Sequence, residues 1–336
     1  MSKTILFALT DWEWQTFFPG KMRADVLSLA GKAVVVDPLS FDEAGWAQQL
    51  QDTQPDILVA AWKTPTLPDN WATLTGGRLK YLCYLAGSVR KLVNPRQLED
   101  GLIVTNWGNT ISRVVAECAL MLAIACMRRA SYWTISMHRE GTWKTPDTIT
   151  GSVFERRIGI HGFGAISREL VKLLQPFDTT ISTYSPRVPD QLLAEYNVHR
   201  ADTLEDLFAD NDIVFELAAL TPENTGVVTE ELLRRIPEGG AFVNIGRGAV
   251  VDEAALARVA ADGKIQVGLD VYGQEPLPAD SPFRHNDAIL TLPHLGGPTT
   301  DRRQDSGRLA IQNLKAFLQG GDLESVVNVD VYQRAS

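Results

Sequence analysis

Cysteine is scarce in this sequence, and it contains neither a long apolar run nor a basic excess. Its three cysteines, Cys83, Cys118 and Cys126, lie in apolar segments and are too few and wrongly spaced for a disulfide framework or a metal site. We therefore expect buried thiols, no bound metal and a cytoplasmic location. The longest apolar run, residues 119–127, is less than half of a membrane span of about 20 residues, and the start shows no signal-peptide core.

The charge balance excludes another group of functions. The chain carries 41 acidic against 32 basic side chains, a formal net charge of -9. Such a chain offers no electrostatic footprint for nucleic acid or an anionic membrane, so we expect small-molecule partners. An apolar fraction of 45% over 336 residues favours a globular protein of about two domains.

Strand-like and helical segments alternate along the chain, which predicts parallel sheets covered on both faces. The strands of a first α/β unit are expected at residues 4–9, 33–37, 56–62, 79–85 and 102–106. A long, mostly buried helix is expected at residues 112–129, where two terminal arginines favour a helix end. The strands of a second unit are expected at residues 156–164, 179–185, 212–220, 241–246, 265–272 and 288–294.

A glycine turn opens the second unit. Gly162, Gly164 and Ser167 have the spacing G-x-G-x-x-(small) where an apolar strand meets a helix. The first glycine permits a tight turn, the second lets a pyrophosphate approach the backbone, and the helix N-terminus stabilises negative charge. This context predicts dinucleotide binding. His161, just before the turn, is interpreted as a strand residue whose nitrogens are satisfied by hydrogen bonds, not as a catalyst.

The end of the next strand bears on the choice of cofactor. An acidic residue is typical there when the adenosine ribose has a free 2'-hydroxyl, but this chain has Ser185, followed by Arg187. A small neutral side chain and a guanidinium suit a 2'-phosphate, so NADP is favoured over NAD. The alternative is that Arg187 simply points into water.

Four further residues have the chemistry of a reactive site. Arg247 lies between two glycines, where a guanidinium could grip a carboxylate. Asp270 is expected inside an apolar strand, where a nicotinamide amide is one candidate donor to it. Glu275 precedes a proline, and His294 ends an apolar run, where it is either a core or capping residue or a proton-transfer group.

Taken in order, these motifs resemble the D-isomer-specific 2-hydroxyacid dehydrogenase family. They are G-x-G-x-x-S, N-x-G-R-G-x-x-V-D, L-D-V-Y-x-x-E-P and L-P-H-x-x-G, and the likeness covers nearly the whole chain. The resemblance implies a Rossmann nucleotide-binding domain, residues 107–297, inserted into a flavodoxin-like substrate domain of residues 1–106 and 298–336. It implies two doubly wound parallel sheets, substrate bound between the domains, and a homodimer formed through the nucleotide domain.

The resemblance also implies roles for individual residues. Arg247 would orient the substrate carboxylate and keto oxygen, His294 would donate the proton, and Glu275 would hydrogen-bond the second imidazole nitrogen. Backbone N–H groups of Gly87, Ser88 and Val89 would bind the substrate carboxylate. The implied cofactor-binding positions are Gly162, Phe163, Gly164, Ala165, Ile166, Ser185, Arg187, Leu217, Thr221, Ile245, Gly246, Asp270 and Gly296.

Some positions depart from the family pattern. Arg90 and Lys91 follow the carboxylate loop and either receive a second anionic group or are solvated. Leu217 and Ala219 stand where histidine and proline are common, and this change, together with Glu216, bears on the shape of the cofactor and substrate pocket. Trp107 replaces a smaller residue. The expected function is reversible NAD(P)H-dependent reduction of a small 2-keto acid, such as glyoxylate, hydroxypyruvate or a related compound. The alternative is a dinucleotide-sensing regulatory protein of the same fold, and the sequence does not identify the acid.

Overall fold

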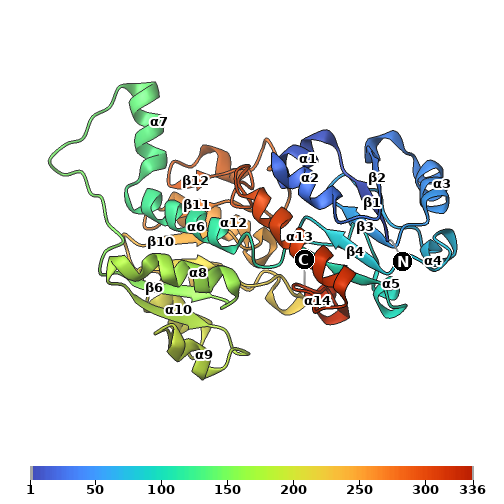
Figure 1. Ribbon diagram of the computed structural model, residues 1–336. Helices are drawn as coiled ribbons and strands as arrows, with labels where there is room; N and C mark the ends of the chain where they lie inside the picture. The colour runs from blue at the N-terminus through green and yellow to red at the C-terminus, as the bar shows by residue number, and fades with distance from the viewer. Residues whose placement is uncertain (1–2, 335–336) are drawn as a thin grey trace. The chain divides into compact units, whose positions relative to one another are not determined.

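The chain divides into two units (Figure 1), and the structure, a computed structural model, describes residues 3–334. Unit 1 holds the residues up to Ile111 and those from Pro298 onward, and unit 2 runs from Ser112 to Gly297. The junctions taken from the sequence lie at 106/107 and 297/298. Each unit has a parallel sheet of its own and is described separately below.

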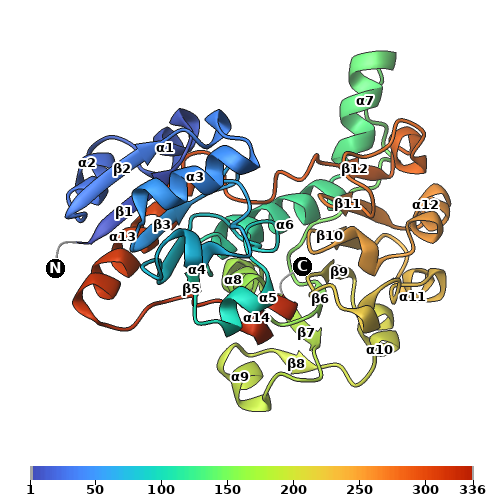
Figure 2. The same ribbon diagram turned by 90° about the vertical axis from the view of Figure 1, so that its right-hand side faces the viewer.

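The sheet of unit 1 has five parallel strands in the order β2-β1-β3-β4-β5 (Figure 2). Its strands are β1 (Thr4–Ala8), β2 (Lys32–Val36), β3 (Ile57–Ala60), β4 (Tyr81–Tyr84) and β5 (Ile103–Thr105). Every residue of β1, β3 and β4 is buried, because these apolar runs are covered on both faces. This is the flavodoxin-like order, in which the order of the strands reverses between β1 and β3 while all strands stay parallel.

Helices cover both faces of this sheet. They are α1 (Asp11–Phe17), α2 (Lys21–Leu27), α3 (Glu43–Thr53), α4 (Trp71–Leu74), α5 (Pro95–Glu99), α13 (Arg303–Gln319), α14 (Val329–Arg334) and the 3-10 turn η1 (Pro38–Ser40). One core packs Trp14 of α1 and Leu314 of α13 on the sheet, and the other packs Trp46 and Leu50 of α3 on the opposite side. Helix α13, from the far end of the chain, therefore completes unit 1.

The sheet of unit 2 has seven parallel strands in the order β12-β11-β10-β9-β6-β7-β8. They are β6 (Arg157–His161), β7 (Thr180–Tyr184), β8 (His199–Arg200), β9 (Ile213–Glu216), β10 (Ala241–Asn244), β11 (Gln266–Leu269) and β12 (Ile289–Thr291). The strand order reverses at β6 and β9, as in a Rossmann fold. In such sheets ligands bind outside the carboxyl ends of the strands at the reversal.

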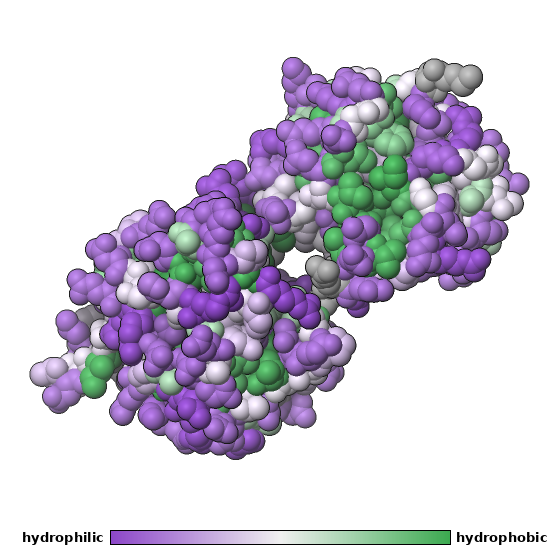
Figure 3. Space-filling view, turned by 90° about the horizontal axis from the view of Figure 1, so that it is seen from below, coloured by the Kyte–Doolittle hydropathy of each residue, from purple (hydrophilic) through white to green (hydrophobic). Residues whose placement is uncertain are grey.

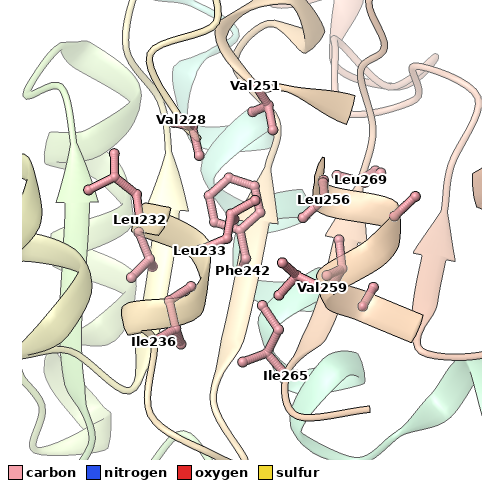
Figure 4. Close-up of a cluster of buried hydrophobic side chains, with 14 of the residues drawn as sticks. Val228, Leu232, Leu233, Ile236, Phe242, Val251, Leu256, Val259, Ile265 and Leu269 are labelled. Carbon is pink, nitrogen blue, oxygen red and sulfur yellow. The ribbon is translucent and has the colours of Figure 1, made fainter. Parts of the chain in front are cut away.

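The helices of unit 2 also lie on both faces of its sheet. They are α6 (Ser112–Met127), α7 (Ala130–Glu140), α8 (Ala165–Leu174), α9 (Asp190–Glu195), α10 (Leu204–Ala209), α11 (Glu230–Arg235), α12 (Glu253–Ala261) and the 3-10 turns η2 (Gln175–Phe177), η3 (Pro222–Asn224), η4 (Gly248–Val250) and η5 (Pro282–His285). In one core, Phe242 of β10 is enclosed by Leu233 of α11 and Leu256 of α12 (Figure 4).

The helix expected at residues 112–129 ends earlier than predicted. Helix α6 stops at Met127, and Arg129 adopts a left-handed φ of 54° before α7 begins. The two arginines thus follow the helix instead of forming its last turn. Otherwise the predicted class, α/β with two doubly wound parallel sheets, is confirmed.

The face shown in Figure 3 is mostly polar, with some apolar patches. Within residues 3–334, no helix combines the length and the apolar character that crossing a membrane requires.

Candidate active site

The glycine turn after β6 has the geometry expected from its spacing. Gly162 has a φ of 85°, and a Cβ there would lie 2.7 Å from Cα of Ala218, so conformation and space both require glycine. At Gly164 a Cβ would meet nothing within 4 Å, so the packing of the chain itself does not demand glycine. Helix α8 starts at Ala165 with no side-chain cap among the described residues, which leaves its first N–H groups available. Phosphate oxygens bind at such a terminus.

The other predicted residues of this turn have structural contacts. The Ser167 hydroxyl donates a hydrogen bond to Gly162 O at 2.8 Å, so it pins the helix to the turn. The Phe163 ring is buried edge-on against Tyr196, with 5.8 Å between centroids. Ile166, in the first turn of α8, is half-buried. Only the backbone of Phe163 is therefore available to a ligand.

The loop after β7 is held by an arginine that sequence reasoning missed. Arg200, on β8, donates to Asp190 Oδ1 at 2.6 and 2.8 Å and to the carbonyl oxygens of Ser185 and Val188. It therefore holds this loop in shape. Arg187 is exposed, and its charge helps to lower the pKa of Glu223, whose pKa is lowered chiefly by a hydrogen bond from Thr221. Strand β8 has only two residues, which is too short a pattern to reveal Arg200 from sequence.

At the reversal of strand order, His161 is paired with Glu216. His161 Nδ1 lies 2.6 Å from Glu216 Oε2, and the two side chains are 5% and 0% exposed. Glu216 Oε1 accepts the Ala218 N–H at 2.9 Å, and Leu217 N–H donates to His161 O. His161 is thus a satisfied strand residue, as its position indicated. Glu216 shapes the loop that carries Leu217, while Thr221 caps the following turn, η3.

Arg247 follows β10, the next strand in the sheet. Its Nη1 donates to Gly246 O at 2.7 Å. Burial lowers the pKa of Arg247, and the negative charge of Glu275 opposes this shift, which indicates that the two groups interact. Both flanking glycines are required by close packing: a Cβ at Gly246 would lie 3.0 Å from Glu216 O, and one at Gly248 would overlap the Tyr272 backbone.

Glu275 and His294 meet although 19 residues separate them in the chain. His294 Nδ1 lies 2.6 Å from Glu275 Oε2, and the side chains are 51% and 35% exposed. Glu275 Oε1 accepts the Tyr272 N–H at 3.1 Å, which orients the carboxylate. His294 has a left-handed φ of 55°. With Nδ1 engaged, Nε2 is the nitrogen left for proton transfer.

Asp270 differs from its prediction in position and in partners. It lies directly after β11, not inside it, and it is buried. Its two oxygens accept the N–H groups of Leu295 at 2.7 Å and Gly296 at 2.8 Å, so the chain itself provides the expected donors. Burial raises the pKa of Asp270, while these hydrogen bonds and the charge of His294 oppose the rise. Asp270 therefore anchors the backbone next to His294.

Gly296 and Ile245 are packed against each other and against Asp270. A Cβ on Gly296 would lie 2.5 Å from Ile245 Cδ1 and 2.7 Å from Asp270 Oδ2. Arg247, Asp270, Glu275 and His294 thus gather at the carboxyl ends of β10, β11 and β12, which are neighbours in the sheet.

The predicted carboxylate loop lies in unit 1, after β4. Among the described residues, none accepts a hydrogen bond from the N–H of Gly87, Ser88 or Val89. The Val89 side chain is buried, and its carbonyl accepts from Leu92 and Val93. Consecutive free N–H groups of this kind can bind an anion.

Arg90 does not extend this anion site. Its Nη2 donates to the carbonyl oxygens of Tyr332 and Gln333 at 3.3 and 3.0 Å, and its guanidinium stacks on the Tyr332 ring. It therefore fastens α14. Lys91 is exposed.

These two sheets and the residues at their carboxyl ends define a two-unit α/β enzyme. Residues 120–296 match the family model for the D-isomer specific 2-hydroxyacid dehydrogenase NAD binding domain. The chain is 32% identical to the glyoxylate/hydroxypyruvate reductase B of Pectobacterium atrosepticum over 69% of its own length and 74% of that protein. It therefore belongs to the D-isomer specific 2-hydroxyacid dehydrogenase family, a family of oxidoreductases.

Two further relatives extend the comparison. The D-3-phosphoglycerate dehydrogenase of Methanocaldococcus jannaschii is 29% identical over 69% of this chain, but the match spans only 44% of that enzyme. The NAD-complexed D-isomer specific 2-hydroxyacid dehydrogenase of Lactobacillus delbrueckii ssp. bulgaricus superposes with a TM-score of 0.79. That alignment covers 97% of this chain and 100% of the other at 17% identity, so it supports the fold alone.

Proposed function

We propose that the protein reversibly reduces a 2-keto acid, such as glyoxylate, hydroxypyruvate or a related compound, to its D-2-hydroxy acid with NAD(P)H. The observation that carries this proposal is the 2.6 Å contact between His294 Nδ1 and Glu275. It leaves Nε2 of an accessible imidazole free to transfer a proton. Arg247 and Asp270 follow the paired strands β10 and β11 at the same edge of the sheet. The accessible imidazole, the carboxylate and the guanidinium are the groups this reaction needs.

The packing around the turn after β6 leaves room for the pyrophosphate of a dinucleotide. Gly164 has open space where a side chain would be, next to an uncapped helix N-terminus. A pyrophosphate would be bound there by the N–H groups of Ala165 and Ile166. The nicotinamide, when bound, supplies the hydride.

The residues of the chain would handle the proton and the charges. In reduction, hydride adds to the keto carbon with its electron pair and forms the new C–H bond. The π electrons of the carbonyl then take the proton from His294 Nε2, so that the N–H bond breaks as the O–H bond forms. Glu275 stabilises the protonated imidazole before this step. Arg247 would polarise the keto oxygen and hold the carboxylate, and the N–H groups of Gly87, Ser88 and Val89 would bind carboxylate oxygen. In oxidation, His294 takes the proton back.

The test is NAD(P)H oxidation followed at saturating cofactor over a panel of 2-keto acids, for the wild type and for Arg247→Ala and His294→Ala. Both variants are expected to lose at least about 100-fold in kcat/KM. Unchanged turnover in both would refute the site. Cofactor binding without turnover of any 2-keto or 2-hydroxy acid would favour the sensing role instead.

For the cofactor, we propose NADPH over NADH. Ser185 brings no carboxylate to the end of β7, and the exposed Arg187 is available to a 2'-phosphate. The ratio of kcat/KM values for the two cofactors should exceed one and should fall in Arg187→Gln. A ratio below one in the wild type would reverse this choice.

A homodimer through unit 2 is also proposed. Large apolar side chains are exposed along residues 121–154 of this unit, among them Met121, Ile124, Met137, Trp143, Ile149 and Phe154. Clustered exposure of this kind is typical of an interface. Light scattering after size exclusion should give twice the chain mass, and Ile149→Asp with Met137→Asp should give the monomer. A wild-type monomer at micromolar concentration would contradict the proposal.

A further inference from the structure

Three tryptophans lie at the ligand-binding edge of the unit 1 sheet. Trp12 is in the first turn of α1, after β1; Trp62 follows β3; and Trp107 follows β5. In the order β2-β1-β3-β4-β5, the order of the strands reverses between β1 and β3. Ligands of doubly wound sheets bind outside the carboxyl ends at this reversal, which is where Trp12 and Trp62 project from the chain.

The three rings form one continuous aromatic wall. The centroids of Trp12 and Trp62 are 5.7 Å apart, and those of Trp62 and Trp107 are 6.2 Å apart with the ring planes at 76°. Trp107 lies directly on the carboxylate loop, because a Cβ on Gly87 would be 2.7 Å from its ring. The wall therefore ends at the N–H groups proposed to bind the substrate carboxylate.

The wall is open on its outer side. Trp12 is 49% exposed and Trp62 is 37% exposed, whereas Trp14 and Trp46 in the same unit are buried. Exposed indole rings forgo the free energy that burial would provide. The packing of unit 1 does not account for this exposure. An aromatic or bulky apolar ligand group would cover these faces.

A single cation fixes the wall. The Arg303 guanidinium carbon lies 4.9 Å from the centroid of Trp12 and 5.4 Å from that of Trp62. Its Nη1 donates to Thr16 Oγ1 at 3.3 Å, and its Nε is buried with no partner among the described residues. Stacking on two indoles uses the face of the guanidinium, which positions the rings. Since Arg90 is engaged at α14, the neutral rings are the surface offered to a substrate side chain.

We propose that Trp12, Trp62 and Trp107 bind the side chain of the substrate, and that the preferred substrates are 2-keto acids with an aromatic ring on C3. The inference rests on the proposed function, because the carboxylate of this acid is placed on the Gly87 loop. Aromatic side chains bind other rings in stacked or edge-on geometry, which an indole wall provides. Glyoxylate, with hydrogen in place of a side chain, would leave the wall uncovered.

The experiment compares kcat/KM for phenylpyruvate, 4-methyl-2-oxopentanoate, glyoxylate and 3-phosphohydroxypyruvate. Phenylpyruvate is expected to exceed glyoxylate by about 100-fold, the scale at which apolar pockets discriminate. In Trp62→Ala this ratio should fall by at least about tenfold, and Trp62→Phe should restore most of it. Leu39→Ala removes another exposed apolar side chain of unit 1 and should leave the ratio unchanged.

Each contrary outcome is distinct. If no acid is turned over, the proposed function fails. If glyoxylate is turned over best, or if the ratio is the same in Trp62→Ala, the aromatic subsite is wrong and the dehydrogenase stands. A preference for 3-phosphohydroxypyruvate that Arg303→Gln abolishes would show an anionic subsite instead. Thermal unfolding of each variant separates lost binding from lost folding.

Discussion

Unit 2 contains two histidine–glutamate pairs with the same contact and opposite surroundings. In both, imidazole Nδ1 lies 2.6 Å from a glutamate Oε2. In both, the other carboxylate oxygen accepts a backbone N–H, from Ala218 in the His161 pair and from Tyr272 in the His294 pair. The His161 pair is buried, while the side chain of His294 is half exposed.

The comparison shows that pairing geometry alone does not identify a proton-transfer site. A carboxylate on Nδ1 fixes an imidazole in one orientation wherever it occurs. What differs is whether Nε2 can reach a substrate. The buried pair ties the ends of β6 and β9 together, where His161 and Glu216 are register partners, and the exposed pair presents a nitrogen outward.

The largest effect should appear when His294 is replaced. His294→Ala removes the proton donor and should lower kcat/KM about 10²- to 10⁴-fold, with stability nearly unchanged because the side chain is accessible. Steady-state kinetics and urea unfolding measure the two quantities. A variant that keeps its activity, or one that loses stability in proportion to activity, would make the exposed pair structural like the buried one.

Replacing a member of the buried pair should lower the stability of the fold, in contrast to the loss of activity expected for His294→Ala. Glu216→Ala leaves the His161 nitrogen and the Ala218 N–H without their acceptor in a dry environment, and should reduce the free energy of unfolding by about 3 kcal/mol. Urea unfolding checks this, with His294→Ala as the accessible counterpart. A loss of less than about 1 kcal/mol would show that the pair contributes little to the fold.

The negative charge of Glu275 should contribute less to kcat/KM than the imidazole of His294. Glu275→Gln keeps a group able to hydrogen-bond Nδ1 but no longer stabilises the protonated ring. We expect kcat/KM for reduction to fall about 10- to 100-fold. Steady-state kinetics in both directions of the reaction test this. Unchanged kcat/KM would assign Glu275 a purely orienting role, because glutamine keeps the hydrogen bond and loses only the charge.

The residues of the pairs were easier to predict than the contacts between them. His294, at the end of an apolar run, and Glu275, before a proline, were singled out by their chemistry, and the family resemblance then implied their roles. His161 was noted because it directly precedes the glycine turn. Glu216 was visible only as a departure from the family pattern, since its register with His161 depends on which strands are neighbours. The acceptors of the Leu295 and Gly296 N–H groups, and the place of Asp270 after β11, likewise required the loop conformation. Parallel sheets followed from the alternation of strands and helices, and their doubly wound form from the family resemblance. The contacts of Arg200 and the stacking of Arg303 on Trp12 join side chains that no spacing in the sequence relates.

The smallest effect concerns the other end of the strands that the buried pair joins. Asp212, just before β9, accepts hydrogen bonds from the Arg157 guanidinium at 2.7 Å and from its N–H at 3.0 Å. Burial acts to raise the pKa of Asp212, but these hydrogen bonds outweigh it and hold the pKa below its ordinary value of 3.8. Because the folded pKa is lower than the unfolded one, the interaction stabilises the fold above the ordinary value and is lost as pH falls through the folded pKa.

Arg157 is about half exposed, so water and salt screen this pair. Asp212→Asn should therefore reduce the free energy of unfolding by only about 0.5–1 kcal/mol at pH 7, and by less in 1 M salt. The unfolding curves of variant and wild type should converge only when the pH falls below the folded pKa of Asp212, which itself lies under 3.8, because the wild-type carboxylate is then protonated as well. The prediction is wrong if Asp212→Asn loses as much unfolding free energy as Glu216→Ala, or if its loss persists in acid. The exposed pair at the start of β6 and β9 would then contribute as much to stability as the buried pair at their ends.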